Sequence, residues 1–284
     1  GGREAQNSNK VIVGLLTDAI KKVAGVPEAA VQMIETRSEV ADMLKEEKYI
    51  NLVVPRGSND FVKYIQENTR IPVLGHSEGI CHNYIDKEAD LSKALRIALD
   101  SKLQYPAACN AMENLLVHRE VASEVIPQLI EKFQEKGVSL VGCDETCKIA
   151  PELSPASESE WDEEYNDLKL AIKITESMEE AISFINTHGS GHTDTIITEN
   201  VETAEEFMDG VNSASVMCNA STRFADGFRY GLGAEIGIST NKTHARGPVG
   251  LEGLVIYKYR VYGKGQIVSD YSGENARSFT HKPL

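Results

Sequence analysis

A repeated order of apolar run, glycine-containing turn and amphipathic segment is the feature that most limits how this chain can fold. The apolar residues 50–54 lead into a turn at 55–59 and then into a helical pattern over 61–65. Residues 71–74 form a second apolar run, which is followed by a turn at 75–79. Short continuous apolar runs are typical of strands buried in a parallel sheet, and parallel strands require crossover connections. The alternation therefore predicts an α/β fold.

The same alternation continues along most of the chain. Helices are predicted over residues 11–23, 38–47 (with Ser38 as N-cap), 61–65, 121–135, 178–186 and 204–211. Strands are predicted over residues 31–34, 50–54, 71–74, 81–82, 114–118, 139–141, 168–174, 193–198 and 215–218. The acidic, serine-rich residues 154–167 are interpreted as a surface excursion that includes Trp161. Residues 255–284 alternate apolar and polar side chains around Gly263-Lys264-Gly265, which predicts a hairpin.

Charge and cysteine content limit the possible partners. The net charge of −14 makes nucleic acid and anionic membranes unlikely general partners, and no apolar run approaches the ~20 residues of a membrane span. Five cysteines, an odd number, favour a reducing compartment over a disulfide framework, so a cytoplasmic location is expected. Cys143 and Cys147 lie four residues apart, but no second pair completes a metal site, and we expect no metal.

Cys109 is the candidate nucleophile. It follows a proline and two alanines (Pro106-Ala107-Ala108) and directly precedes the predicted strand 114–118. Small neighbours leave room around the sulfur, and a backbone N–H at such a turn can face an oxygen on the atom that a thiolate attacks. Acyl or hydride transfer through a thioester needs this arrangement. The alternative is a small buried apolar residue, which is how most free cysteines behave.

Several polar residues in turns are candidates for ligand binding. Gly57 and Ser58 open a helix after a buried strand, where free N–H groups favour a pyrophosphate, and Arg3 offers a cation for a further phosphate. His76 and Glu78 lie in a turn that we place at the end of a strand, where ligand sites of open sheets gather. Either residue is a candidate base, although a hydrogen-bonding role is the commoner one.

The loops over residues 219–253 are dense in Gly, Asn, Ser, Thr and Arg, which suggests loops shaped around a ligand. Arg223 and Arg246 are the candidates for binding a carboxylate or phosphate through two hydrogen bonds. An equally weighted alternative is that both arginines tie loops together through backbone carbonyls.

Four segments together resemble gamma-glutamyl phosphate reductase, also called glutamate-5-semialdehyde dehydrogenase, within the aldehyde dehydrogenase superfamily: residues 75–82, 105–110, 219–224 and 244–251. The resemblance implies an aldehyde-dehydrogenase-like α/β fold. A partial Rossmann-type NADP-binding domain is expected over residues 1–104, and an α/β catalytic domain over 105–254. The hairpin, residues 255–284, is expected to join subunits of a homo-oligomer.

The implied activity is NADPH-dependent reduction of L-glutamyl 5-phosphate to L-glutamate 5-semialdehyde with release of phosphate, a step of proline synthesis. The resemblance makes Cys109 the catalytic residue. It assigns substrate binding to Asn110, Asn219, Arg223, His244 and Arg246, and NADPH binding to Arg3, Gly57, Ser58 and Glu78. The alternatives are an oxidative aldehyde dehydrogenase, which needs a glutamate to activate water, and a non-catalytic fragment of the same fold.

Family members carry a long region before the position of Gly1, including the first strand of the cofactor-binding sheet. We therefore expect this chain alone to be poorly active. The resemblance also implies a glutamate 5-kinase as a partner or fused domain. A mitochondrial location is an alternative if the chain is part of such a bifunctional synthase.

Overall fold

The computed structural model describes residues 3–76 and 78–280. The chain divides into two compact units, residues 1–254 and 255–284, which are described separately. Among the described residues, no helix is both long and apolar enough to cross a membrane.

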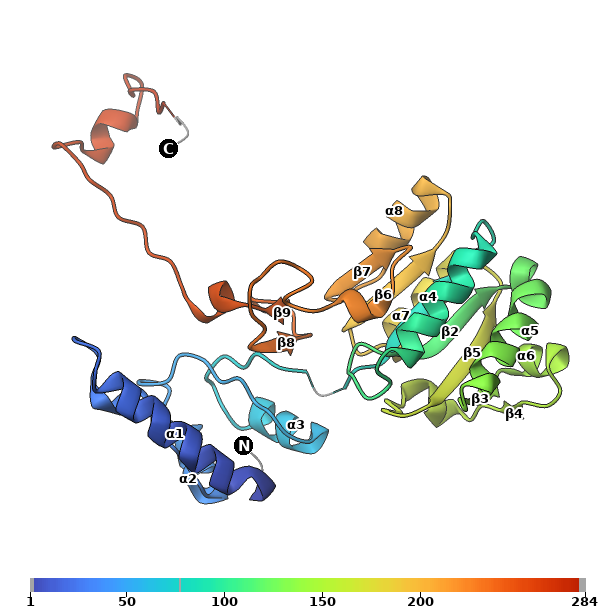
Figure 1. Cartoon of the computed structure of the whole chain (residues 1–284). Coiled ribbons are helices and arrows are strands. Elements are labelled where there is room, and N and C mark those ends of the chain that lie inside the picture. The colour runs from blue at the N-terminus through green and yellow to red at the C-terminus, as the bar shows by residue number, and fades with distance from the viewer. Residues whose placement is uncertain (1–2, 77, 281–284) are drawn as a thin grey trace. The chain divides into compact units, whose positions relative to one another are not determined.

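A seven-stranded sheet is the framework of the first unit (Figure 1). Its strand order is β4-β3-β5-β2-β1-β6-β7, and every neighbouring pair is parallel. The strands are β1 (Cys81–Ile85), β2 (Met112–His118), β3 (Ser139–Gly142), β4 (Ser154–Pro155), β5 (Lys169–Thr175), β6 (Thr193–Ile197) and β7 (Ser215–Cys218). The predicted α/β class is confirmed.

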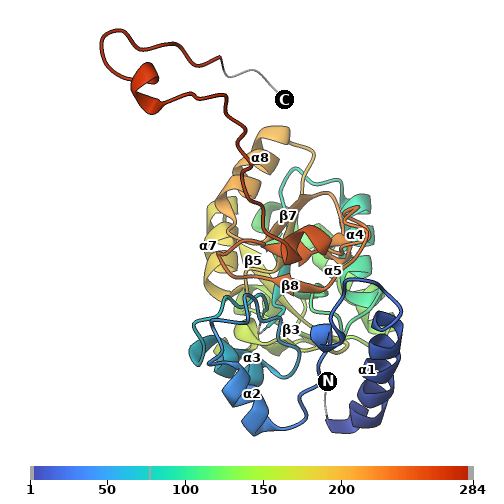
Figure 2. The same cartoon turned by 90° about the vertical axis from the view of Figure 1, so that its left-hand side faces the viewer.

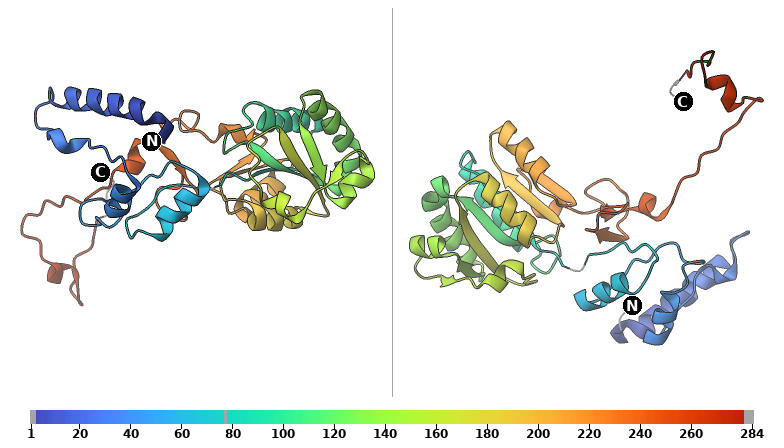
Figure 3. Two further views of the ribbon diagram at one scale, coloured as in Figure 1. Left: turned by 90° about the horizontal axis from the view of Figure 1, so that it is seen from below. Right: turned by 180° about the vertical axis from the view of Figure 1, so that it is seen from behind.

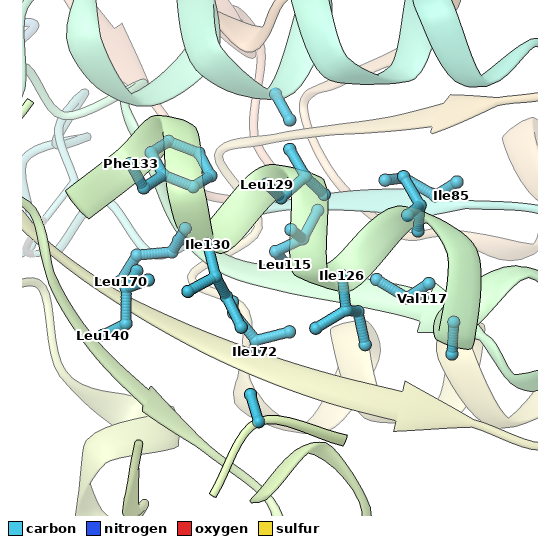
Figure 4. Packing of buried hydrophobic residues seen from close by; sticks show 14 of the residues in the cluster. Ile85, Leu115, Val117, Ile126, Leu129, Ile130, Phe133, Leu140, Leu170 and Ile172 are labelled. Carbon is cyan, nitrogen blue, oxygen red and sulfur yellow. The ribbon is translucent and has the colours of Figure 1, made fainter. Parts of the chain in front are cut away.

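Helices cover both faces of this sheet (Figure 3). α4 (Leu91–Leu103), α5 (Arg119–Glu135) and α6 (Asp144–Ile149) pack on one face, and α7 (Met178–His188) and α8 (Val201–Gly210) pack on the other. Successive strand side chains point to opposite faces, so Leu115 and Val117 of β2 contact the α5 side while Leu116 contacts the α7 side. Figure 4 shows Leu129 and Phe133 of α5 in the first of these layers. Central strands buried on both faces explain the continuous apolar runs.

The expected domain boundary at residue 104 falls inside this sheet. β1 precedes that boundary and pairs with both β2 and β6, and α4 packs on the same core. Residues 81–103 therefore belong with the segment predicted as the catalytic domain. The sequence analysis did not predict α4, and the position of β1 between β2 and β6 is not visible in the sequence.

The N-terminal part contains helices but no extended sheet (Figure 2). Its elements are η1 (Arg3–Ala5), α1 (Gln6–Ile20), η2 (Glu28–Ala30), α2 (Arg37–Met43) and α3 (Asn59–Glu67). Among the described residues, the strands predicted at 50–54 and 71–74 are reduced to one parallel bridge, between Val53 and Val73, and 31–34 forms no strand. A strand requires a hydrogen-bonded neighbour, and a single bridge is all that these runs find. Thr36, rather than Ser38, caps α2 through a capping box with Glu39.

Two loop regions complete the first unit. The segment predicted as a surface excursion contains η3 (Glu158–Asp162), where Trp161 is buried against the sheet, so that interpretation is wrong for Trp161. A two-stranded antiparallel sheet, β8 (Gly237–Ser239) and β9 (Gly247–Val249), lies between η4 (Thr222–Phe224) and η5 (Leu251–Leu254).

The second unit does not form the predicted hairpin. Its described residues, 255–280, contain one short helix, η6 (Val268–Tyr271), and no strand. Apolar side chains at alternating positions are exposed, among them Tyr259 at 86% and Val261 at 90%. The alternation is typical of a strand, but the described part of this unit contains no second strand with which it could pair, so the prediction of a hairpin is wrong for residues 255–280.

Candidate active site

Three loops meet at the amino ends of adjacent strands. Cys109 lies in the turn just before β2, residues 76–80 precede β1, and His192 immediately precedes β6. These strands are neighbours in the order β2-β1-β6 and run parallel, so their starting ends lie side by side. The placement of His76 and Glu78 at the carboxyl end of a strand was therefore wrong, because the strand that defines the site follows them.

The backbone of Cys109 rests directly on Gly79. A Cβ added at Gly79 would lie 2.1 Å from the carbonyl oxygen of Cys109 and 2.6 Å from its Cα. Real side chains do not tolerate such distances, so only glycine fits at this position. The turn itself is closed by two backbone hydrogen bonds, from Ala108 N–H to the Tyr105 carbonyl (3.2 Å) and from Ala111 N–H to the Ala108 carbonyl (2.8 Å).

A histidine contacts the sulfur. Nε2 of His192 lies 3.2 Å from the Cys109 Sγ, and Nδ1 of the same ring lies 2.8 Å from the Thr193 hydroxyl. His192 is 2% exposed. His76 is adjacent to His192, with the two rings edge to face and their centroids 5.2 Å apart. His76 Nδ1 lies 3.2 Å from the Ile238 carbonyl of β8.

Burial dominates the electrostatics of the pair. It raises the pKa of the Cys109 thiol to about 11, with the Glu164 and Glu235 carboxylates adding to the rise and the Arg223 guanidinium opposing it. Burial also lowers the pKa of His192 to about 3, and electrostatic interaction with His76 and Arg223 acts in the same direction. At neutral pH the site therefore holds a protonated thiol beside a neutral imidazole.

A cavity of about 200 Å³ opens onto this sulfur. Its walls include Cys109, His76, Glu164 and the turn that carries Arg56 and Gly57. Burial raises the pKa of the Glu164 carboxyl, which limits its negative charge near the thiol. The cavity thus connects the candidate nucleophile with the candidate phosphate-binding turn, two features that the sequence placed more than fifty residues apart.

The structure gives two predicted substrate ligands structural contacts. Asn219 has a φ of 53°, and its side-chain amide accepts from the Thr198 N–H (3.1 Å) and donates to the Thr198 carbonyl (2.7 Å). Asn110 is buried and donates to the Ala225 carbonyl at 2.8 Å, while its Oδ1 has no partner among the described residues. Asn219 therefore joins the ends of β6 and β7, and Asn110 ties the cysteine turn to the loop after η4.

The two arginines divide between the roles weighed for them. Arg223 donates from Nε to Gln104 (2.9 Å) and acts electrostatically on Cys109, which places a positive charge at the site. Arg246 donates from Nη2 to the Asn212 carbonyl (2.8 Å), so it ties loops together, yet its buried Nε has no partner among the described residues. His244 is exposed on the same loop.

His192 and Glu164 were missed by the sequence analysis. The available signal was positional: His192 stands directly before an apolar strand (193–198), as the Cys109 turn stands before residues 114–118. Adjacent parallel strands bring such positions together, but strand order is not visible in the sequence. Glu164 was assigned to the supposed surface excursion.

Comparison with known proteins agrees with this geometry. The model of the aldehyde dehydrogenase family matches residues 6–172. The chain belongs to this family. Gamma-glutamyl phosphate reductase of Methanococcoides burtonii is 56% identical over 289 residues, covering 100% of this chain and 64% of that protein. The enzyme of the same name from Acetivibrio thermocellus is 54% identical and covers 100% and 65%.

The fold comparison gives the same answer. The crystal structure of gamma-glutamyl phosphate reductase from Thermotoga maritima superposes with a TM-score of 0.91 at 43% identity, covering 94% of this chain and 65% of that one. An acetylating aldehyde dehydrogenase from Geobacillus thermoglucosidasius shares the fold at 19% identity, with a TM-score of 0.61. The chain spans slightly less than two thirds of the length of the gamma-glutamyl phosphate reductases it matches.

The aldehyde dehydrogenase fold implies a nicotinamide cofactor, and the start of α3 is the candidate position for its pyrophosphate. α3 begins after Ser58, no side chain caps its first N–H groups, and the preceding Gly57 lines the cavity of Cys109. Uncapped N–H groups at a helix start suit a pyrophosphate. Glu78 instead pairs with Lys63 of α3 at 3.1 Å. Arg3 begins η1, and its side chain lies outside the part that the structure describes.

Proposed function

We propose that the chain carries the catalytic site of an acyl-phosphate reductase, which reduces L-glutamyl 5-phosphate to L-glutamate 5-semialdehyde. The observation that carries this proposal is the 3.2 Å contact between His192 and the thiol of Cys109, a residue that lines the cavity. The names of the similar enzymes supply the substrate. Phosphate release and aldehyde formation both follow from chemistry at this sulfur.

The first step is acyl transfer to Cys109. His192 takes the thiol proton, and the sulfur forms a bond to the acyl carbon while the bond from carbon to the phosphate oxygen breaks. Phosphate leaves with the proton that His192 held, and a thioester remains on Cys109. The Cys109 N–H, which donates to no backbone carbonyl among the described residues, is the donor that faces the developing oxyanion.

The second step reduces the thioester. NADPH, when bound, supplies the hydride that adds to the thioester carbonyl carbon. The resulting thiohemiacetal collapses, the carbon–sulfur bond breaks, and the aldehyde departs. The electron pair returns to the Cys109 sulfur, which takes a proton from solvent. Gly57 and the start of α3 would hold the pyrophosphate of the cofactor.

An oxidative aldehyde dehydrogenase is the second candidate, and Glu164 is the observation that favours it. This carboxyl lines the cavity of Cys109, and burial raises its pKa, as a base that activates water for thioester hydrolysis requires. The two activities differ in their need for phosphate. Oxidation of glutamate 5-semialdehyde with NADP⁺ requires inorganic phosphate in the first case and proceeds without it in the second.

Acyl transfer tests the proposal without depending on hydride transfer. Glutamyl 5-phosphate is generated in the sample from glutamate and ATP by a glutamate 5-kinase, and phosphate release is followed after correction for a kinase-only control. We expect one glutamyl group per chain on Cys109 by mass spectrometry, and none in Cys109→Ala. A chain that gains no acyl group, or gains it equally after Cys109→Ala, would reject the proposed nucleophile.

The expected setting follows from the same proposal. We infer a cytoplasmic enzyme that works as a homo-oligomer, with a glutamate 5-kinase as the source of its substrate. A mitochondrial location applies if the chain is part of a bifunctional synthase. The five free cysteines suit a reducing compartment.

A further inference from the structure

Three side chains of metal-binding types lie together, and the Cys109 sulfur is one of their ligand atoms. His76, Cys109 and His192 each offer one ligand atom, and these atoms all lie within 4.8 Å of one another. The acyl-transfer chemistry uses Cys109 and His192 but gives no task to His76. The site therefore contains one more imidazole than the proposed reaction uses.

Both histidines are held in orientations suited to binding a metal ion. The Nδ1 of His76 is directed at the Ile238 carbonyl, which can only accept, so Nδ1 carries the hydrogen and Nε2 keeps its lone pair. Nδ1 of His192 is occupied by the Thr193 hydroxyl, which leaves Nε2 facing the sulfur. Such outer hydrogen bonds fix the tautomer and orientation of metal-ligating histidines.

The spacing and charge also fit a small thiophilic cation. Zn–S bonds of about 2.3 Å and Zn–N bonds of about 2.0–2.1 Å place sulfur and nitrogen about 3.5 Å apart around a tetrahedral ion. The 3.2 Å from Sγ to His192 is close to this value. The carboxylates of Glu164 and Glu235 act on Cys109 and favour a cation there, whereas Arg223 opposes one. The cavity supplies an entry path and space for a fourth ligand.

We propose that His76, Cys109 and His192 bind Zn²⁺, with the fourth position open to the cavity, and that the bound ion reversibly masks the nucleophile. Binding replaces the thiol hydrogen by a sulfur–zinc bond and releases one proton to solvent, while each imidazole donates a lone pair. The binding itself does not depend on the reaction that the chain catalyses. Only the resulting loss of activity rests on the proposed function.

Co²⁺ and Cd²⁺ are the spectroscopic probes for this site. We expect Co²⁺ added to the 284-residue chain under reducing conditions to give the visible absorption of a tetrahedral thiolate complex. Cd²⁺ should give an ultraviolet sulfur-to-metal band, and Zn²⁺ should displace both at one equivalent. The absence of both thiolate bands in the folded chain would overturn the proposal.

Single variants identify the ligands. Cys109→Ser should abolish the bands, and His76→Ala and His192→Ala should each weaken Zn²⁺ binding in calorimetry by about tenfold or more, since loss of an outer-shell partner alone costs about 10–100-fold. The double variant Cys143→Ser with Cys147→Ser is the matched control, because these two cysteines lie four residues apart and are a second place where thiols could bind the metal. Bands that survive Cys109→Ser, bands lost only in the control, or unchanged binding after His76→Ala contradict the assignment.

Masking is read by alkylation. One equivalent of Zn²⁺ should slow labelling of Cys109 by iodoacetamide at least tenfold, mapped by peptide mass spectrometry, and a chelator should restore it. This readout separates the two proposals: a chain that binds Zn²⁺ yet accepts no glutamyl group retains the metal site and loses the proposed function. A labelling rate of Cys109 that Zn²⁺ leaves unchanged rejects the mask.

Discussion

At the scale of single residues, the candidate site depends on what stands next to Cys109. Gly79 permits the cysteine turn to reach its position, and His192 contacts the sulfur. Both residues lie far from Cys109 in the sequence, and no other described residue replaces either contact. Substitution of Gly79 or His192 should therefore alter the Cys109 thiol more than it alters the other neighbours of the substituted residue.

We expect Gly79→Ala to displace the Cys109 turn. The added methyl would overlap the Cys109 backbone, which cannot move aside as a flexible side chain does, and overpacking of this kind costs about 1–3 kcal/mol or more. Chemical denaturation should show the loss, and iodoacetamide labelling should show altered access to Cys109. Gly14→Ala is the control, because nothing lies within 4 Å of its Cβ and the exposed helix should gain about 0.5–1 kcal/mol. Equal stability of the two variants would contradict this account.

His192→Ala should slow acylation of Cys109 by about 100-fold or more, the usual range for loss of a positioned base. Rapid-quench mass spectrometry of the glutamyl adduct measures the rate. His188→Ala is a matched control, because this histidine lies in α7 and its Nδ1 contacts the Asp162 carboxylate instead. If both variants acylate at the rate of the unaltered chain, His192 is not the proton acceptor.

At the scale of elements, a buried ion pair joins α4 to β2. Lys102 Nζ lies 2.5 Å from Glu113 Oε2, and both side chains are fully buried. Burial raises the pKa of Glu113 to about 7 and lowers the pKa of Lys102, so it disfavours both charges. The interaction between the two groups opposes the effect of burial on each of them. Glu113 also accepts from the Asn166 N–H at 3.4 Å, so the pair connects to a wall of the cavity.

Lys102→Met should destabilise the fold by about 3–5 kcal/mol at neutral pH, because it leaves an uncompensated carboxylate in the core. The loss should shrink at acid pH. Without Lys102 the folded-state pKa of Glu113 lies above about 7, higher than in the unfolded chain, so its contribution is favourable below pH 4.5 and is lost as pH rises through the folded-state value. Urea unfolding between pH 5 and pH 8 measures this dependence.

Two comparisons test the cause. Lys102→Met with Glu113→Leu should recover much of the stability at neutral pH, since apolar replacement of a whole buried pair is often tolerated. Lys93→Met breaks the exposed pair with Glu199 and should change stability little. A Lys102→Met variant as stable at pH 8 as at pH 5 would show that Glu113 is not the source.

At the scale of the whole molecule, exposed apolar side chains are concentrated in two segments of the described chain. α1 has no buried residue, although Val11, Ile12, Leu15 and Leu16 are apolar, and residues 255–268 expose an alternating apolar set. The first segment, α1, belongs to the N-terminal part, in which the predicted strands form only one bridge. The second has the pattern of a strand and no partner among the described residues, which is the basis for inferring a homo-oligomer.

Ile256→Lys with Val261→Lys should therefore reduce self-association without changing the thermal unfolding of residues 1–254. Two ammonium groups on an extended segment, one on each of its faces, oppose burial of that segment against a second copy. Sedimentation velocity over a range of concentrations measures the mass. Lys258→Glu, on an adjacent exposed position, controls for a general effect of charge. An unchanged mass in the double variant would show that this segment does not join subunits.

The sequence by itself determined the α/β class, most strands of the sheet unit and its helices α5, α7 and α8. It also singled out the candidate nucleophile Cys109 and the candidate phosphate-binding turn at Gly57. Those features follow from local periodicity and from residue chemistry at turns, which need no knowledge of neighbours. Only the tertiary structure decided that β2, β1 and β6 lie side by side, and therefore that His192 contacts Cys109. The tertiary structure also decided that Trp161 is buried. It also decided against the hairpin at 255–284 and the strands at 31–34 and 50–54, because an apolar run becomes a strand only where another strand accepts its backbone hydrogen bonds.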